Sequence, residues 1–262
     1  MKLKRRIALG TSQLDEVDDS IVIRSINPGV PHESVSTVNL MGGSGQRVTA
    51  QHWEYLEVSV TYAINIPKEQ LAERREVFDA ANEWALGKGW LSINYMTGKR
   101  MWVDKVVIPG SGDLFEWNAE FTITFRAYAV PFWQDDTATE EEIAVADEGS
   151  GTIEVPGMQE TVCEAEITNE SGSTINTLSI TVGNCSMSFT NLGLDDDERL
   201  VIGHGTDGIL YIRIYTGDVL YRSAMAKRTG GNDELYVMPG ENDITITGGD
   251  VSAVVSCCGR YL

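Results

Sequence analysis

The sequence lacks the marks of several protein classes. Among 262 residues, no apolar run approaches the length of a membrane span, so we expect no insertion into a membrane. The apolar stretch behind the basic first residues ends at Leu9, before polar and acidic residues, so we expect no export signal and synthesis in a cytoplasm. The four cysteines show no C-x-x-C spacing, which argues against a zinc or redox motif and favours buried, reduced thiols.

Motifs for catalysis or metal binding are equally scarce. Only three histidines are present, none in an H-x-x-x-H pair, and no serine lies in a G-x-S-x-G elbow. The glycine-rich segment 42–47 lacks the lysine and the following helix of a phosphate loop, so a flexible or tight turn is expected. The acidic run 195–198 lacks calcium-loop spacing and predicts a solvated turn. We therefore predict no catalytic residue, no cofactor and no metal. The enzyme alternative is a hydrolase using Asp104, Asp113 or Glu116 around a hairpin.

Negative charge is distributed unevenly along the chain. Residues 1–134 carry 14 Lys+Arg and 16 Asp+Glu, giving −2, whereas residues 135–262 carry 6 and 23, giving −17. This balance argues against specific binding of DNA, because phosphate counterions are replaced by basic surfaces. The first part can pack against copies of itself, and the second stays well solvated. The acidic stretch 135–150 predicts an exposed linker between domains at 1–134 and 151–262.

The first half predicts strands and one helix. Apolar residues alternate with polar ones over 56–64, which indicates a half-buried strand. A helix is predicted over residues 67–86, with Gly87 as its stop signal and Arg74 among the charged residues that face outward. Further strands are predicted at 90–95, 101–108 and 117–127.

The second half predicts strands alone. Short alternating segments recur with turn residues between them, among them Pro239-Gly240 and Gly248-Gly249. This spacing is typical of a β-sandwich. The strands are predicted at 163–167, 178–182, 185–189, 210–214, 219–221, 244–246 and 251–255.

Sandwich folds often bind sugars, so a carbohydrate-binding protein is an alternative. All six tryptophans lie in the first half, which leaves the sandwich without the largest aromatic platform. The alternation places Tyr211 and Tyr215, with Arg213 between them, on the exposed side of a strand. Ordinary surface tyrosines are the favoured interpretation.

The order of several weak motifs in the first half carries a resemblance. They are the loop 41–47, the strand with Glu54 and Glu57, the helix, Trp90-Leu91, the closing strand 121–125, and Pro131-Phe132-Trp133. In this order, residues 21–132 resemble the N-terminal domain of siphophage distal tail proteins.

The second half is similar to the galectin-like C-terminal domain of the same family. The matching segments are 183–189, 198–202 and 235–242. Where such proteins often continue with Asp-Thr after the 198–202 strand, this chain has Gly203-His204. The resemblance implies a mainly β fold. An N-terminal β-sandwich-like belt domain with one α-helix and a β-hairpin would precede a galectin-like β-sandwich.

The resemblance also implies assembly in place of catalysis. Similar proteins form a homohexameric ring at the virion tail tip, between the tail tube protein and a tail-associated lysin or fibre protein. Their outer domains can carry a receptor-binding protein, and the genome passes through the ring without specific binding. A tail tube protein with an extra domain is a further alternative. We hypothesise a ring or lumen contact at Gly42, Gly43, Gly45, Arg47 and Trp53.

Overall fold

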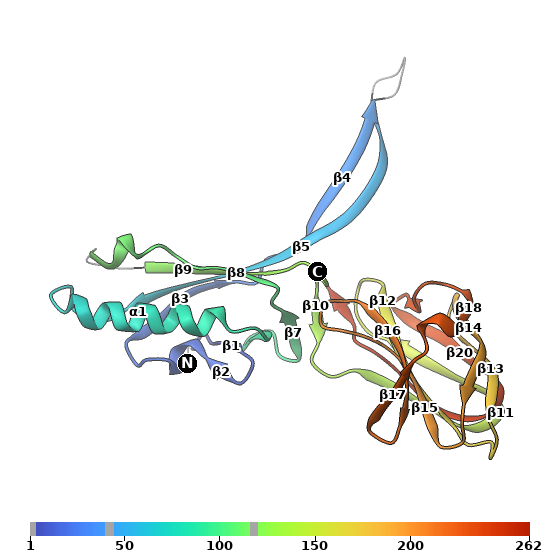
Figure 1. Cartoon of the computed structure of the whole chain (residues 1–262). Helices are drawn as coiled ribbons and strands as arrows, with labels where there is room; N and C mark the ends of the chain where they lie inside the picture. Colours follow the sequence, from blue (N-terminus) through green and yellow to red (C-terminus); the bar gives the residue numbers. More distant parts are fainter. Residues whose placement is uncertain (1–3, 40–44, 116–119) are drawn as a thin grey trace. The chain divides into compact units, whose positions relative to one another are not determined.

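The chain divides into two compact units. The computed structural model describes residues 4–39, 45–115 and 120–262. The first unit ends at Trp133 and the second spans Gln134–Tyr261 (Figure 1). Strands dominate both units, and the described residues contain one α-helix, α1. The predicted mainly β fold with one helix is therefore confirmed. No helix in these ranges is long and apolar enough to cross a bilayer.

The first unit contains two sheets and the helix. One sheet has the order β2-β1-β6-β7, and the other has the order β3-β5-β9-β8 with β4 also paired to β5. The elements in chain order are β1 (Ile7–Leu9), β2 (Ser12–Gln13), η1 (Leu14–Glu16), β3 (Ile21–Asn27), β4 (His32–Asn39), β5 (Gln46–Ile64), α1 (Leu71–Leu86), β6 (Trp90–Ile93), β7 (Lys99–Trp102), β8 (Lys105–Val107), η2 (Ser111–Phe115) and β9 (Glu120–Ala127).

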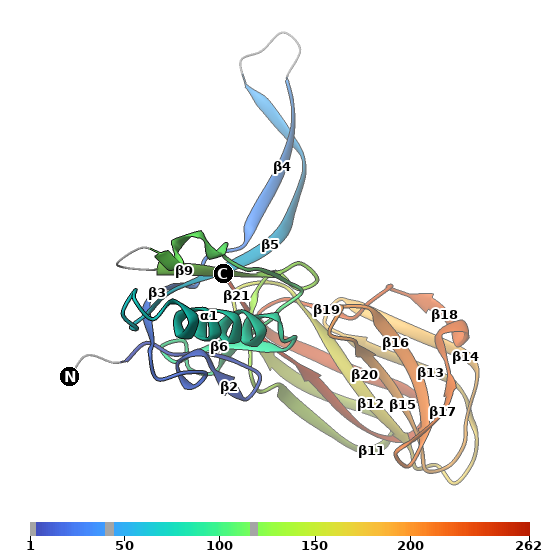
Figure 2. The ribbon, with the colours of Figure 1, turned by 60° about the vertical axis from the view of Figure 1, so that its left-hand side comes forward.

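The core of this unit lies between the second sheet and the helix. Alternate side chains of β5 from Leu56 to Tyr62 are fully buried, as the sequence predicts for a half-buried strand. Strand β9 pairs with this part of β5 and places Phe121 opposite Tyr62. The ring of Phe78 on α1 lies 4.8 Å from that of Phe121. By contrast, β4 and the first part of β5 extend away from this core (Figures 1 and 2).

Helix α1 begins later than predicted. The N–H of Gln70 donates to the carbonyl of Pro67, so residues 67–70 form a turn before the helix starts at Leu71. Its end at Leu86, followed by Gly87, agrees with the prediction. The predicted strand at 101–108 is two strands, β7 and β8.

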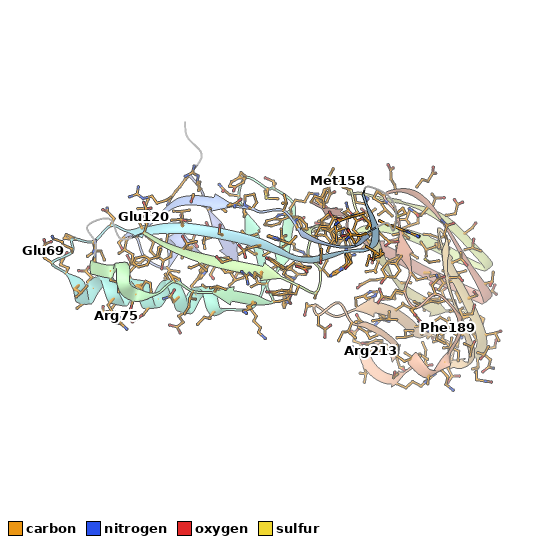
Figure 3. The ribbon with its side chains drawn as sticks, turned by 90° about the horizontal axis from the view of Figure 1, so that it is seen from above. Glu69, Arg75, Glu120, Met158, Phe189 and Arg213 are labelled. Carbon is orange, nitrogen blue, oxygen red and sulfur yellow. The ribbon has the colours of Figure 1, made fainter. Side chains whose placement is uncertain are left out.

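Arg74 corrects the prediction that the charged residues of this helix face outward. Its side chain is buried, and Nε and Nη1 donate to the carbonyls of Ile66 and Leu114, each at 2.8 Å. The buried guanidinium thus satisfies the carbonyl of Ile66 before α1 and that of Leu114 in η2. The neighbouring Arg75 lies on the outside of the unit, as expected (Figure 3).

The second unit is a sandwich whose two sheets share a pair of long strands. Strand β20 pairs with β12 through its second part and with β13 through its first part, and β11 pairs with β20 along both. The strands from the unit boundary onward are β10 (Trp133–Asp135), β11 (Thr139–Val155), β12 (Thr161–Asn169), β13 (Ile175–Val182), β14 (Cys185–Leu194), β15 (Glu198–His204), β16 (Leu210–Thr216), β17 (Val219–Ser223), β18 (Arg228–Gly231), β19 (Tyr236–Val237), β20 (Gly240–Cys257) and β21 (Arg260–Tyr261), with η3 (Met225–Lys227) before β18.

Gly248 and Gly249 lie inside β20, where the sequence predicted a turn. Both have positive φ, at 127° and 150°, so the strand bends there without ending. A Cβ on Gly248 would lie 2.2 Å from the carbonyl oxygen of Thr177, which only glycine avoids. The bend carries β20 from one sheet into the other. The inward side chains of both sheets form one buried core. The galectin-like character of this sandwich stays a prediction.

The acidic stretch 135–150 is not a linker, which corrects the sequence-based prediction. Residues 139–155 form β11, which pairs with β20 from Thr139 to Val155. Ile143 is buried while Glu140 and Glu142 are exposed, so these two glutamates occupy outward positions of a folded strand. Charge density alone therefore did not distinguish an acidic strand from a linker.

Candidate assembly interface

A two-stranded ribbon extends from the first unit, and the ribbon has no core of its own. We define the ribbon as β4 with Gln46–Tyr55 of β5, and it pairs from His32↔Tyr55 to Asn39↔Gln46. Almost every side chain in it is exposed. In both views it rises away from the sheet and from α1 (Figures 1 and 2). Isolated two-stranded hairpins are at best marginally stable in water, so contact with another surface would stabilise this ribbon.

The register places apolar side chains on both faces of the ribbon. Because opposed residues in an antiparallel pair share a face, Val48 lies with Thr37, and Arg47 lies with Val38. Alternation along β4 then adds Val35 to the first face. The side chains of Val35, Val38 and Val48 are 47%, 56% and 52% exposed, so neither face is covered within the unit. We call these faces the Val48 face and the Arg47 face.

Polar side chains hold the strands of the ribbon together. The Thr37 hydroxyl donates to Gln46 Oε1 at 3.0 Å, and Gln46 Nε2 donates to Asn39 Oδ1 at 3.2 Å. Thr49 Oγ1 donates to the Ser36 carbonyl at 3.1 Å. Exposed hydrogen bonds of this kind add little net stability, but they fix the register in which the valines are displayed.

Aromatic side chains anchor the base of the ribbon to the unit. His32 stacks on Tyr55 with ring centroids 4.3 Å apart, and Tyr55 lies 5.6 Å from Tyr128. Arg126 Nε donates to Glu57 Oε2 at 2.7 Å, and this hydrogen bond is the main cause that raises the pKa of the guanidinium. The base is therefore a packed joint, and the ribbon leaves it in a defined direction.

The sequence-predicted contact residues fall in different places. Gly42 and Gly43 lie outside the described residues, and Gly45 is exposed directly before β5. Arg47 is exposed on the Arg47 face, whereas Trp53 pairs with Glu33 near the base, on the Val48 face.

Trp53 also packs within its own unit, since its ring meets the edge of Phe132 at 5.7 Å. The structure therefore places Arg47 and Trp53 on one ribbon but on opposite faces. Sequence reasoning missed the three exposed valines, because neither face of the ribbon is buried and no alternation of apolar and polar residues marks it.

The residues weighed for a hydrolase do not form a cleft among the described residues. Asp104 Oδ2 accepts hydrogen bonds from the backbone N–H groups of Tyr128 and Ala129, at 2.6 and 2.9 Å, which is a structural role. Nothing is described of the Asp113 side chain, and Glu116 lies outside the described residues. Within the described ranges, no group of three or more metal-ligating side chains is assembled.

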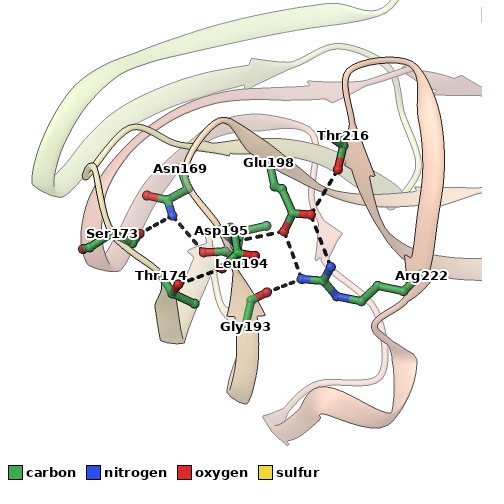
Figure 4. Close-up of polar contacts among 9 residues, drawn as sticks. All are labelled: Asn169, Ser173, Thr174, Gly193, Leu194, Asp195, Glu198, Thr216 and Arg222. Carbon is green, nitrogen blue, oxygen red and sulfur yellow. Dashed lines mark hydrogen bonds and ion pairs between the residues drawn. The ribbon is translucent and has the colours of Figure 1, made fainter.

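The acidic run 195–198 is a turn whose carboxylates bind different partners. Asp195 accepts from Thr174, and Asp196 accepts from the N–H of Gly172. Glu198 is buried and binds Arg222 at 2.9 Å (Figure 4). Burial alone would raise the pKa of Glu198, but its hydrogen bonds from Arg222, Asp195 N–H and Thr216 outweigh burial and lower it. The carboxylates therefore do not converge on a cation site.

Tyr211, one of the tyrosines considered as a platform for a sugar, is already covered by neighbouring residues. The Arg213 guanidinium lies over the Tyr211 ring at 4.3 Å from its centroid. A Cβ on Gly203 would lie 2.6 Å from the Tyr211 hydroxyl, so that ring lies across the neighbouring strand. Arg213 also donates to the Tyr215 hydroxyl at 3.5 Å. These contacts leave no free aromatic face at Tyr211 for a sugar ring.

Comparison with solved structures finds the same fold across the whole chain. The Dit protein (gp 19.1) of phage SPP1, described as a paradigm of the hub adsorption apparatus in phages that infect Gram-positive bacteria, matches with a TM-score of 0.71. The match covers 100% of both chains at 9% identity, which shows a shared fold.

Chains from two structures of the phage P2 baseplate in its activated conformation also match. The sequence identity is 10% for the structure with Ca and 9% for the structure with Sr. The match to the structure with Ca covers 98% of both chains, and the match to the structure with Sr covers 96% of this chain and 97% of the other. Both have a TM-score of 0.48, which is too low to support an argument. The sequence matches no family model and no curated protein.

Proposed function

We propose that this chain is a structural protein of a phage tail tip, a hub of the distal tail type, and that its work is assembly. Copies of the first unit join into a closed homohexameric ring. The ring connects the tail tube protein on one side to a tail-associated lysin or fibre protein on the other. The second unit remains at the periphery, where it offers a surface to a receptor-binding protein.

The ribbon is the observation that carries this proposal. It exposes Val35, Val38 and Val48 to solvent on two faces and has no core of its own. Because each valine is about half exposed, burying the remainder against another copy stabilises by roughly 1 kcal/mol each. The fold shared with the SPP1 Dit protein, a paradigm of the hub adsorption apparatus, supports the same role.

A ribbon with two dissimilar faces favours a ring over a simple pair. A two-fold dimer joins the same patch on both copies, whereas a ring joins one patch to a different patch on the next copy. The Val48 face and the Arg47 face differ in charge, because Arg47 is the one basic residue between 32 and 55. A neighbour can therefore bind each face through a different surface.

The charge division agrees with this arrangement. The first 134 residues carry a net −2 and self-associate without strong repulsion, while the remaining residues carry −17. Six such acidic units would repel each other if they were crowded together. Their place is therefore on the outside, in water.

Native mass spectrometry of the full chain tests the proposal. The parent is expected at six times the chain mass of 28.8 kDa, or a multiple of that ring. The double variant Val35→Asp, Val48→Asp is expected as a monomer, because two carboxylates on the Val48 face cannot be buried without partners. The matched control is Ile209→Asp, Val219→Asp, which alters two side chains of the second unit that are 66% and 72% exposed. A monomeric parent, or an assembly unaffected by the ribbon variant, contradicts the proposal.

A second variant examines the opposite face. Arg47→Glu reverses the basic charge of the Arg47 face without adding or removing an apolar group. Ring assembly should weaken, and an unchanged ring removes Arg47 from the contact. Labelled electron microscopy of whole tails then separates a hub from a tube protein, since a hub is labelled at the tip and a tube protein along the tail.

A further inference from the structure

Two of the four cysteines face each other in the core of the second unit. Strand β12 pairs with β20 so that Cys163 lies directly opposite Cys257. Both residues are buried, at 0% and 3% exposure, and both thiols are free. Cys185 and Cys258 are partly exposed and form no disulfide with each other.

The local hydrogen bonds give this pair the closer of the two antiparallel geometries. The Cys163 N–H donates to the Leu235 carbonyl at 2.9 Å, on the side of β12 away from β20. A strand residue directs its N–H and C=O to the same side, so Cys163 and Cys257 form a non-hydrogen-bonded pair. Opposed Cα atoms in such pairs lie about 4.5 Å apart, with the side chains close. A disulfide spans Cα separations of roughly 4.4–6.8 Å, so the backbone already fits one.

The two paired thiols shift each other's pKa in opposite directions. The neighbouring Cys257 thiol, more than burial, raises the pKa of Cys163. The neighbouring Cys163 thiol lowers the pKa of Cys257, against the effect of burial. Cys257 is therefore the thiol that ionises first and attacks.

We propose that Cys163 and Cys257 are a cross-link site, which closes to a disulfide when a low-molecular-weight disulfide is the oxidant. The Cys257 thiolate attacks one sulfur of the oxidant and releases one small thiolate. Cys163 loses its proton and attacks the Cys257 sulfur of the mixed disulfide, which releases the second small thiolate. The protein loses two protons and two electrons, and the oxidant is reduced to two thiols.

Entry to the buried pair requires local opening of the strands around it. Strand β19 covers this end of β12 through two register pairs, Thr161↔Val237 and Val162↔Tyr236. So short a strand opens locally at little cost compared with global unfolding. A reducing cytoplasm keeps the thiols free, and the bond closes in an oxidising medium. The site stands independently of ring assembly, since it needs only the register within the sandwich.

The experiment compares the full chain after oxidised glutathione or the small oxidant diamide with the chain held in dithiothreitol. Each sample is denatured, alkylated and weighed, then digested without reduction. The oxidised chain is expected to take up two fewer alkyl groups and to yield a peptide that joins Cys163 to Cys257. Its Tm should rise and return to the reduced value with dithiothreitol, because the bond closes a long loop.

Matched variants make the assignment specific. Cys185→Ser with Cys258→Ser leaves only the proposed pair and should still lose both alkylation sites on oxidation. Cys163→Ala, and separately Cys257→Ala, should give no intramolecular cross-link. Two free thiols at 163 and 257 after both oxidants overturn the proposal, as does a cross-link to Cys185 or Cys258 in the parent chain.

Discussion

Two long antiparallel strand pairs of similar build have opposite surroundings in this molecule. The ribbon of the first unit has both faces in solvent, and residues 32–55 contain two acidic residues and one basic residue. The β11–β20 pair of the second unit covers a buried core, and β11 carries six acidic residues and no basic one. The first pair exposes apolar side chains and carries little charge. The second pair buries its apolar side chains and carries many acidic residues.

The open edges of these strands explain the difference. In the described residues β11 pairs with β20 alone, so its other edge offers unpaired backbone groups to any strand that approaches. Charged residues on an edge strand discourage such pairing. The ribbon carries less of this protection, since residues 32–55 contain two acidic residues and one Arg. The difference in edge charge is what the proposed contact between copies predicts.

Removing the ribbon should produce the largest effect. Residues 33–54 are replaced by Asn-Gly, which joins His32 to its register partner Tyr55 through a two-residue turn. Assembly should be abolished in native mass spectra. The free energy of unfolding of the first unit should fall by no more than about 3 kcal/mol, because the main internal loss is the half-buried Trp53 with its aromatic contact to Phe132. Intact rings from this variant would show that the ribbon is not needed for assembly, and the contrast between the two strand pairs would then have no role in it.

The sequence predicted the parts of the fold in which one face of a strand is buried. Alternation located β5 from Leu56 onward, β9 and most strands of the sandwich, because burial forces a period of two. It failed on β4 and on the outer part of β5, where neither face is buried and two bulges shift the register. The predicted contact named Arg47 and Trp53 of the ribbon but not its exposed valines, and it stays a prediction.

Charge misled the sequence analysis in two places. The acidic stretch 135–150 predicted a linker, yet most of it belongs to β11, in which Glu140 and Glu142 are exposed and Ile143 is buried. Arg74 was predicted to face water, but it donates to two loop carbonyls inside the first unit. Both errors have one cause. A sequence states that a residue is charged, and only the fold states which groups are available to pair with it.

The second-largest effect should come from the buried ion pair of the sandwich, and it should remain within that unit. Glu198→Ala leaves Arg222 and the N–H of Asp195 without their carboxylate partner. The expected loss is about 2–3 kcal/mol, toward the low end for a buried pair because Arg222 is partly exposed. Chemical denaturation measures it.

A more exposed ion pair provides the matched control for Glu198→Ala. Glu166→Ala breaks the Arg199 pair, in which both side chains are partly exposed, and should cost about 0.5 kcal/mol. Rings should form in both variants. Equal losses from the two would show that burial does not distinguish these pairs.

Neutralising the acidic edge should bring the second strand pair closer to the first in behaviour. With Glu140, Glu142 and Glu154 changed to Gln, β11 keeps its side-chain shapes and loses three exposed charges. Static light scattering at low ionic strength should report association beyond the parent assembly, since the edge is less protected. The control changes Glu73, Glu76 and Glu83, exposed on α1, to Gln and should scatter like the parent. Equal scattering from both triple variants would leave net charge, and not edge position, as the cause.

The smallest effect concerns pH and one histidine of the sandwich. His204 lies between Glu164, whose Oε1 is 3.9 Å from Nδ1, and Glu234, whose Oε2 is 3.7 Å from Nε2. Burial lowers the pKa of His204 below its ordinary value of 6.5, against the attraction of both carboxylates and with a further lowering by Arg260.

A histidine with a lowered folded pKa binds its proton more tightly in the unfolded chain, so its protonation favours unfolding. The stability of the second unit should therefore be full above pH 6.5 and decline as the pH falls through that value toward the folded pKa. Protonation of Glu198 also lowers the stability of the second unit, but in a separate pH window below its ordinary pKa of 4.5. His204→Gln should flatten the Tm profile between pH 7.5 and about 5.5. A profile equally steep in the variant would assign the decline to other groups.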